Sequence, residues 1–327
     1  MKNKTFKVIF FNILFIFILL FAFETILRFF SLSQIQGYRV ELINESLPKI
    51  KKNTEGIVLG KKIYVDQNGY RIPFKNFNYQ GNEKVFFLGD SVTFGVGVKE
   101  EDSFVGIYRK NFDNKKIYNL SLFGYQVSHY SQQFDEIKKL LPAKKIIYFI
   151  TLNDVYDSSN IKVNKFLENR QNTGFRKIFN IDLFKKINFF LREKSFLFTF
   201  LKGITLDSSK SWFQNVLGYY KQNDLSNMKS FLNTFNKFSI DNNIQSYIFL
   251  LPYEFQTRKC DSEQLYPQNK LKIIANEINK NIFDLTSNFC QYKNPKRLFL
   301  KYDPMHLSVE GHRFVYELTK KKIYENE

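Results

Sequence analysis

Beyond residue 84, short apolar runs alternate with longer amphipathic stretches along this 327-residue chain. The runs have the length and composition of buried strands: Val85–Leu88, Lys116–Leu120, Ile146–Leu152, Ser246–Leu251 and, more weakly, Asn281–Leu285. The stretches between and after them have helical periodicity: Phe104–Phe112, Val127–Leu141, Leu225–Asn242, Leu271–Lys280 and Val309–Tyr324. Strands that alternate with helices form a parallel sheet covered on both faces. The sequence therefore predicts an α/β domain.

An apolar run near the N-terminus extends over Val8–Phe23 and continues past Glu24 and Arg28. A membrane-spanning helix needs about 20 apolar residues. This run reaches that length if Glu24 and Arg28 lie at the far interface, where an arginine can extend toward water. Lysines precede the run, at Lys2, Lys4 and Lys7, and predict that this end stays in the cytoplasm. We expect residues 1–30 to form a short cytoplasmic tail and a transmembrane anchor, with the rest of the chain periplasmic or extracellular.

A cleaved signal peptide is the alternative interpretation of this run. It would need a shorter apolar core and small residues at the cleavage site. The run ends instead in Phe21-Ala22-Phe23, so we favour an uncleaved anchor.

The remainder of the chain divides into a polar segment and one large domain. Residues 31–82 are polar, with scattered glycine and aromatic residues, and we expect a stalk that merges into the domain. Residues 83–327 are long enough for one core with room for an insertion. Residues 157–222 fit the strand–helix pattern poorly and contain the only tryptophan, Trp212. We expect a mostly helical insertion there, which either packs on the domain or touches the bilayer.

The chain is basic, because 49 Lys and Arg against 31 Asp and Glu give a formal charge of +18. Lys, Asn, Ile and Phe are all abundant, which indicates a compositional bias, and basic residues are also favourable near anionic lipid. No zinc-finger spacing or aromatic RNA-binding motif accompanies the charge, which argues against a nucleic-acid partner.

The two cysteines, Cys260 and Cys290, lack the spacing of a metal site. A disulfide and a pair of free thiols both remain open. The disulfide requires that this part of the chain lies outside the cytoplasm.

Polar residues that could take part in catalysis follow the carboxyl ends of the predicted strands. In open parallel sheets, functional residues gather at these ends. The segments are Gly89-Asp90-Ser91, Asn119 to Gly124, Thr151-Leu152-Asn153-Asp154 and Asp303-Pro304-Met305-His306. Together they could supply a nucleophile, a base, a group that orients the base, and donors for an oxyanion.

We assign these roles to individual residues. Ser91 opens a turn after the first strand and could attack an acyl carbonyl, and His306 could accept its proton. Asp303, three residues earlier, could hold the other ring nitrogen. The backbone N–H groups of Ser91 and Gly124 and the amide of Asn153 could form the oxyanion hole. We expect no metal and no cofactor.

These four segments, in this order, resemble the SGNH or GDSL-type hydrolases. The resemblance covers residue 84 to the C-terminus apart from the insertion. It implies a flavodoxin-like three-layer α/β/α sandwich, with Ser91, Gly124, Asn153 and His306 as the named residues and Asp303 completing the triad. The third segment usually carries glycine where this chain has Thr151, which we expect to narrow or polarise the cleft.

Two upstream features are similar to the membrane-anchored branch of that family. They are the segment Tyr64–Arg71, followed by the Ser91 segment, and the end of the anchor from Glu24 to Arg28. Proteins of this branch are often linked to acyl groups on cell-surface polysaccharides. The resemblance therefore implies a cell-envelope role.

The combined prediction is an extracytoplasmic serine ester hydrolase that removes or transfers an acyl group, acetyl above all, on a cell-surface carbohydrate or lipid. If a sugar hydroxyl replaces water, the same residues make a polysaccharide O-acyltransferase, which could work with a multi-span acyl-transfer membrane protein. From a different class, a catalytically silent scaffold or binding protein of cell-envelope assembly would keep the fold without turnover. The complete triad argues against the scaffold.

Overall fold

A five-stranded parallel sheet forms the centre of the protein in a computed structural model that describes residues 2–29, 50–156 and 182–324. The strands are β4 (Glu83–Leu88), β5 (Lys115–Asn119), β6 (Lys145–Ile150), β7 (Gln245–Leu250) and β8 (Phe283–Asp284). Their order across the sheet is β5-β4-β6-β7-β8, and all neighbours are parallel. In chain order this is 2-1-3-4-5, the flavodoxin-like arrangement. The predicted fold class is confirmed.

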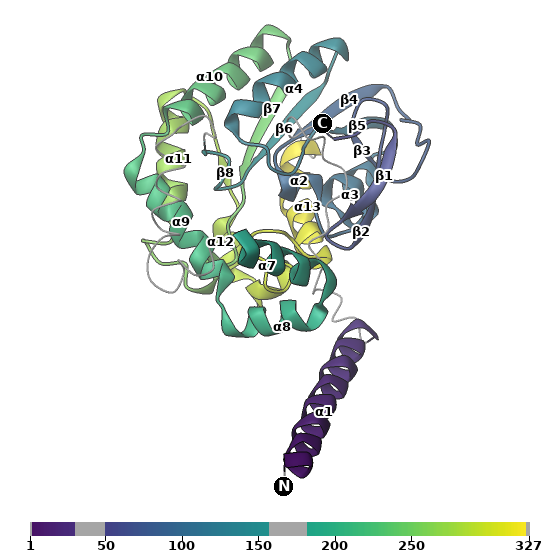
Figure 1. Cartoon of the computed structure of the whole chain (residues 1–327). Helices are drawn as coiled ribbons and strands as arrows, with labels where there is room; N and C mark the ends of the chain where they lie inside the picture. The colour runs from purple at the N-terminus through teal and green to yellow at the C-terminus, as the bar shows by residue number, and fades with distance from the viewer. Residues whose placement is uncertain (1, 30–49, 157–181, 325–327) are drawn as a thin grey trace.

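Helices cover both faces of this sheet (Figure 1). On one face, α3 (Phe104–Asn111) packs on α13 (Val309–Tyr324). On the other lie α4 (Val127–Lys139), α10 (Ser226–Asp241) and α11 (Tyr266–Glu277). Shorter helices are α2 (Ser91–Phe94), α12 (Thr286–Gln291), η1 (Glu100–Asp102), η2 (Gln256–Arg258) and η3 (Pro295–Leu298). Because both faces are covered, the central strands are buried over most of their length, and every residue of β6 is inaccessible to solvent.

A second, antiparallel sheet precedes the domain, formed by β1 (Thr54–Val58), β2 (Lys61–Val65) and β3 (Arg71–Ile72). Its apolar residues form a separate buried cluster with residues of the domain: Ile50, Val58, Leu59, Ile63, Val65, Phe94, Val96 and Leu122. The predicted stalk over 31–82 did not anticipate this sheet, whose strands are short and interrupted by polar residues. Residues 30–49 lie outside the described part of the chain.

Arg71 joins this small sheet to the turn after β4. Its buried guanidinium donates hydrogen bonds to the carbonyl oxygens of Phe94, Gly95 (2.6 Å) and Val98 (2.7 Å). The upstream segment therefore braces the loop that follows Ser91.

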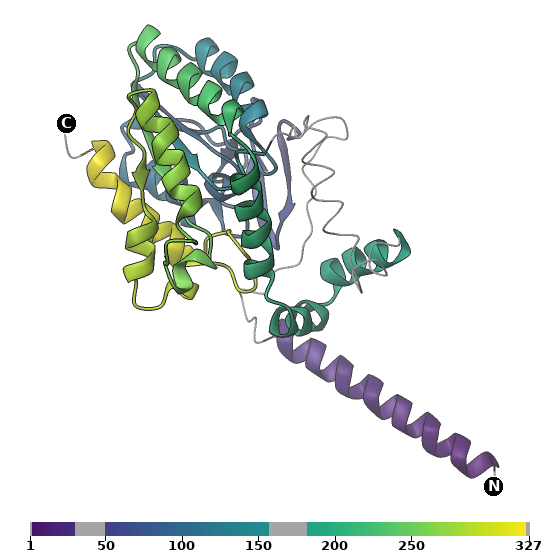
Figure 2. The ribbon, with the colours of Figure 1, turned by 90° about the vertical axis from the view of Figure 1, so that its left-hand side faces the viewer.

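The N-terminal helix α1 (Lys2–Phe29) projects away from the domain over most of its length, and only its C-terminal end contacts the domain (Figures 1 and 2). Over Thr5–Phe29 its mean hydropathy is 2.6. By length and composition it could cross a membrane, as an uncleaved anchor or as a signal sequence.

The region predicted as an insertion is helical where it is described. It contains α7 (Asp182–Lys194), α8 (Phe196–Thr205) and α9 (Ser208–Gln222). Helix α9 buries Phe213, Val216 and Tyr220 in the main core, so it belongs structurally to the domain. Residues 157–181 lie outside the described part.

A disulfide joins Cys260 and Cys290, 30 residues apart in sequence. It connects the loop after β7 to helix α12. The structure therefore shows the bonded form of this pair.

Candidate active site

Ser91 lies where β4 gives way to α2, and the local sequence shapes this turn. Asp90 is the N-cap of α2, and its carboxylate accepts the N–H of Val92 (2.9 Å). Gly89 has a φ of 154°, and a Cβ there would lie 2.2 Å from the Thr93 hydroxyl oxygen. Only glycine fits this position, so the tight turn holds Ser91 at the carboxyl edge of the sheet.

Three side chains form a hydrogen-bonded relay at this edge. The Nε2 atom of His306 lies 2.9 Å from the Oγ of Ser91. Its Nδ1 atom lies 2.8 Å from the Oδ2 of Asp303. The other oxygen of Asp303 accepts the backbone N–H groups of Met305 (2.9 Å) and His306 (2.7 Å). One carboxylate thus orients both the imidazole and the loop that carries it.

Asp303 and His306 influence each other's protonation. Burial alone would lower the pKa of His306, but the charge and hydrogen bond of Asp303 raise it above its ordinary value of 6.5. Burial alone would raise the pKa of Asp303, but the charge and hydrogen bonds of His306 lower it. Asp303 is therefore an anion at neutral pH, and it stabilises an imidazolium on His306.

Asp90 links Ser91 to the end of β6. Its buried Oδ2 accepts the Thr151 hydroxyl (2.8 Å) and the Asn153 amide (3.3 Å), and lies 3.4 Å from the Ser91 Oγ. Burial raises the pKa of this carboxyl. Asn153 is thereby brought beside Ser91, as predicted from their places at neighbouring strand ends.

Tyr253 fixes the orientation of Asn153, a role that no motif in the sequence indicates. Its hydroxyl donates to Asn153 Oδ1 (2.6 Å), and its side chain is 1% exposed. With the carbonyl side held by Tyr253, the amide nitrogen of Asn153 faces Asp90 and the Ser91 turn. The signal that could have found Tyr253 is its position just after β7, the next strand of the sheet.

Thr151 lies beneath the site and does not line a cleft, since it is 1% exposed. Its hydroxyl lies 2.8 Å from Asp90 Oδ2 and 3.1 Å from Asp154 Oδ1. Asp154 also accepts the hydroxyls of Tyr130 (2.9 Å) and Tyr148 (2.8 Å). Burial, then the charge of Asp90, raise the pKa of Asp154 well above its ordinary value. The Thr151 hydroxyl, at the position where the family usually carries glycine, therefore joins two buried carboxyls. Its effect on the width or polarity of the cleft stays a prediction.

Gly124 lies in an exposed turn closed by the Tyr125 N–H on the Leu122 carbonyl (3.2 Å). Its φ of 81° suits the third position of a type II turn, which favours glycine. Within the described residues, no hydrogen bond links Gly124 to Ser91, Asn153 or His306. Its place in an oxyanion hole stays a prediction.

The other two histidines have structural roles. His312 is buried, its Nδ1 accepts the Phe104 N–H (3.2 Å), and burial lowers its pKa to about 3. His129 Nδ1 accepts the Gln126 N–H (3.1 Å) in a capping box at the start of α4. Neither lies in the relay, which leaves His306 as the candidate base.

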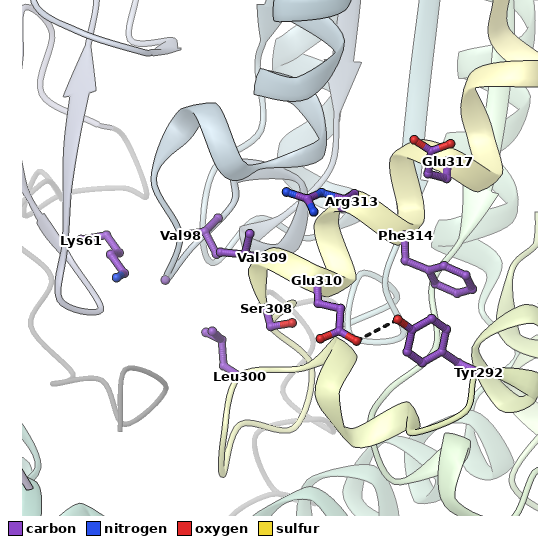
Figure 3. Close-up of a pocket in the computed structure, with 11 residues that line it drawn as sticks. Lys61, Val98, Tyr292, Leu300, Ser308, Val309, Glu310, Arg313, Phe314 and Glu317 are labelled. Carbon is purple, nitrogen blue, oxygen red and sulfur yellow. Dashed lines mark hydrogen bonds between the residues drawn. The ribbon is translucent and has the colours of Figure 1, made fainter. Parts of the chain in front are cut away.

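A separate pocket of about 650 Å³ opens beside the start of α13 (Figure 3). It is lined by Val98, Leu300, Val309 and Arg313, among others, and by Glu310, which accepts the Tyr292 hydroxyl (2.8 Å). Ser91, Asp303 and His306 do not line it. The relay therefore lies outside this pocket.

Comparisons with known proteins gave structural matches alone. No protein-family model matches the sequence, and no curated protein matches it significantly. The acetyl xylan esterase AlAXEase is similar, with 16% identity over 73% of this chain and 99% of its own and a TM-score of 0.43. A lipase/acylhydrolase from Enterococcus faecalis is 13% identical; the match covers 75% of this chain and 97% of that protein, with a TM-score of 0.42. The acetylxylan esterase Axe2 from Geobacillus stearothermophilus is 16% identical; the match covers 76% of this chain and 97% of that protein, with a TM-score of 0.39.

Proposed function

We propose that this chain is a membrane-anchored ester hydrolase or acyltransferase of the SGNH type, with Ser91 as its nucleophile. The observation that carries the proposal is the continuous relay from Ser91 through His306 to Asp303. An activated serine needs a base within hydrogen-bonding reach and a third group that orients that base. Both distances, 2.9 and 2.8 Å, meet this requirement.

The proposed reaction has two acyl-transfer steps. Ser91 Oγ attacks the acyl carbonyl while its proton passes to His306 Nε2. The tetrahedral intermediate collapses, the C–O bond to the alcohol breaks, and His306 returns the proton to the departing oxygen. The acyl-enzyme is then attacked by an acceptor hydroxyl that His306 deprotonates, and Ser91 regains its proton when the new acyl product leaves. Asp303 stabilises the imidazolium in both steps.

The oxyanion donors in this proposal are the N–H groups of Ser91 and Gly124 and the amide of Asn153. Preorganised donors act on the charge that develops in the transition state. Tyr253 acts as a positioning residue, because it holds the opposite end of the Asn153 amide.

The acceptor decides the class of reaction. Water gives an esterase, and a sugar hydroxyl gives a polysaccharide O-acyltransferase. The proposed substrate is an acyl group, acetyl above all, on a cell-surface carbohydrate or lipid, following the sequence resemblance. The lysines in the first turns of α1 support a cytoplasmic N-terminus. The Cys260–Cys290 disulfide supports an oxidising compartment for the domain.

A fluorophosphonate probe tests the proposal directly. We expect covalent labelling of Ser91 in the full-length chain in detergent, read by peptide mapping, because the probe captures activated serines. The exposed Ser230 on α10 gives a matched control. Labelling should vanish in Ser91→Ala and persist in Ser230→Ala; a chain that is folded but unlabelled would favour the silent scaffold.

We expect Tyr253→Phe to lower kcat about 10-fold with little change in KM. Asn153→Ala removes an oxyanion donor and should lower kcat more, by about 10²–10³-fold. In this proposal the Tyr253 hydroxyl acts on catalysis through Asn153, so the double variant should be no slower than Asn153→Ala. Steady-state kinetics on p-nitrophenyl acetate would measure all three variants.

Tyr220→Phe is the control for loss of a buried hydroxyl. Within the described residues, the Tyr220 hydroxyl is buried without a hydrogen-bond partner, so its removal should leave kcat unchanged. Additive losses from Tyr253→Phe and Asn153→Ala would show that Tyr253 does not act through the amide.

A further inference from the structure

The C-terminal end of α1 is joined to the start of α8 by a set of polar contacts. Glu24 accepts hydrogen bonds from the Ser195 hydroxyl (2.9 Å) and from the N–H groups of Phe196 (3.0 Å) and Leu197 (2.8 Å). It therefore caps the N-terminus of α8, where backbone N–H groups lack helical partners. Arg28 pairs with Glu24 (2.7 Å) and lies 5.0 Å from the centre of the Phe196 ring. The apolar helix and α8 are thus held at a defined position.

This joint fixes the depth of α8 relative to a bilayer. Residues Thr5–Phe29 of α1 would extend about 37 Å, longer than a hydrocarbon core of about 30 Å. Glu24 is one and a half turns before the end of α1 (Phe29), which places the joint near the water–lipid interface. Helix α8 then starts at the level where α1 leaves the membrane.

Exposed apolar side chains lie on α7 and on or just after α8, the helix that contacts the end of α1. On α7, the residues Leu183, Phe184, Ile187 and Phe190 are 40–62% exposed, at a spacing that puts them on one helix face. On and just after α8, the residues Leu201, Ile204 and Leu206 are 45–57% exposed. We call these seven residues the apolar platform. Exposed apolar groups gathered in this way mark an interaction surface.

The arrangement of the helices indicates what covers the apolar platform. Helix α8 lies where the end of α1 meets the domain, and it contacts both α1 and α7 (Figures 1 and 2). Helix α7 projects to the side of the domain in Figure 2. The same two helices carry Lys186, Arg192, Lys194 and Lys202. Apolar residues on one face with basic residues around them are the composition of helices that lie in the headgroup region of an anionic leaflet.

We propose that α7 and α8 lie in the headgroup region of the leaflet from which α1 emerges, with the apolar platform facing the acyl chains. The bilayer is the occupant because the platform continues directly from the membrane-spanning helix through the Glu24 joint. The sequence left two possibilities for residues 157–222, packing on the domain or contact with the bilayer. In this proposal α9 takes the first role, and α7 and α8 take the second.

The apolar platform is connected to the relay. At the start of α9, the hydroxyls of Ser208 and Ser209 donate to the carbonyl oxygens of Tyr302 (2.9 Å) and Asp303 (3.4 Å). On α8, a Cβ on Gly203 would lie 2.3 Å from the Tyr302 ring, so this close packing requires glycine. The loop that carries Asp303 is therefore held against the interfacial helices. Resting on the proposed function, this geometry assigns an ester carried at the membrane surface as the substrate class.

Depth-dependent fluorescence quenching tests the position of the helices. The native cysteines are disulfide-bonded, so single cysteines introduced as Ile187→Cys and Ile204→Cys can carry an NBD label. Ile240→Cys is the matched control, because Ile240 is 69% exposed on α10, away from α1. The full chain is reconstituted in phosphatidylcholine–phosphatidylglycerol vesicles that contain a lipid with a nitroxide near the top of its acyl chain. We expect at least a twofold loss of fluorescence at positions 187 and 204 and little at 240.

Equal, weak quenching at all three positions in chains that stay in the membrane after carbonate extraction would overturn the proposal. So would quenching that appears only in self-associated chains, which would assign the apolar platform to a second copy. Because the readout needs no turnover, it separates this inference from the proposed enzymatic function.

The substrate class has its own test. The paired change Ile187→Asp and Phe190→Asp should lower the hydrolysis of a long-chain p-nitrophenyl ester embedded in vesicles at least tenfold, while soluble p-nitrophenyl acetate is turned over normally. Ile240→Asp should change neither rate. Equal loss on both esters would contradict a role in presenting membrane-borne substrate.

Discussion

Ser91→Ala is expected to lower kcat on p-nitrophenyl acetate by about 10⁶-fold, the size of loss found when the nucleophile of a serine protease is removed. The physical reason is that, among the residues the structure describes, the Ser91 hydroxyl is the one hydrogen-bonded to His306 Nε2. Ser91 Oγ occupies the position 2.9 Å from Nε2, at the end of a turn that Gly89 and Asp90 make rigid. Steady-state kinetics on the full-length variant in detergent would measure the loss.

The variant should fold as the parent does, because the turn keeps its main contacts. The Asp90 N-cap bond to Val92 and the Arg71 bonds to the following loop do not involve the serine hydroxyl. A thermal midpoint within a few degrees of the parent would confirm this. A folded variant that retains more than about 1% of the activity would contradict Ser91 as the nucleophile.

The central sheet was predictable because its strands are buried on both faces. Val85 to Leu88 and the whole of β6 have no solvent-accessible area, which requires continuous apolar runs. The observed strands begin and end within about two residues of those runs. The last helix, Val309–Tyr324, was predicted with its observed bounds. By contrast, β8 contains only Phe283 and Asp284, and so short a strand leaves a weak pattern.

The small N-terminal sheet could not be predicted in the same way. Its strands are short, carry Lys61, Lys62 and Glu55, and bury one side against Phe94 and Leu122 of the domain. Such strands are stabilised by tertiary packing more than by their own residue pattern. The sequence of residues 31–82 therefore showed that the segment is polar but did not predict that part of it forms a sheet.

The part of the site that lies at the carboxyl ends of the parallel strands was predictable from the sequence. Asp303 and His306 are close in sequence, and the topology brings Ser91 to them from 215 residues away. Tyr253 lies 100 residues from Asn153, in a segment without a recognisable motif, so only the folded structure shows that it holds the amide. The joint between Glu24 and α8 spans a comparable separation, and it too becomes visible only in three dimensions.

Asp303→Asn is expected to lower kcat by up to about 10⁴-fold, as in serine-protease triads where the same change favours the wrong imidazole tautomer. In this structure Oδ2 of Asp303 lies 2.8 Å from His306 Nδ1. An amide nitrogen at that position would donate to Nδ1, which forces the proton onto Nε2 and prevents Nε2 from accepting the Ser91 proton. Kinetics from pH 5 to 10 would measure both the loss and its pH dependence. A loss below about tenfold would mean that Ser91 and His306 work as a dyad.

The pH dependence separates this electrostatic role from simple damage to the loop. His306 must be neutral to act as a base, and Asp303 raises its pKa above 6.5; activity of the parent should therefore rise with pH through an apparent pKa above that value. In Asp303→Asn the largest cause that raises the pKa is gone, while burial, which lowers it, remains. The acid limb of the variant should therefore move to lower pH even though its maximum rate is far smaller. The charge of Asp90 also raises the pKa of His306. Asp90→Asn should therefore move the acid limb of the pH–activity profile to lower pH by a smaller amount, and this variant serves as the control. A variant with reduced rate but an unmoved acid limb would show that Asp303 supports the loop and not the base.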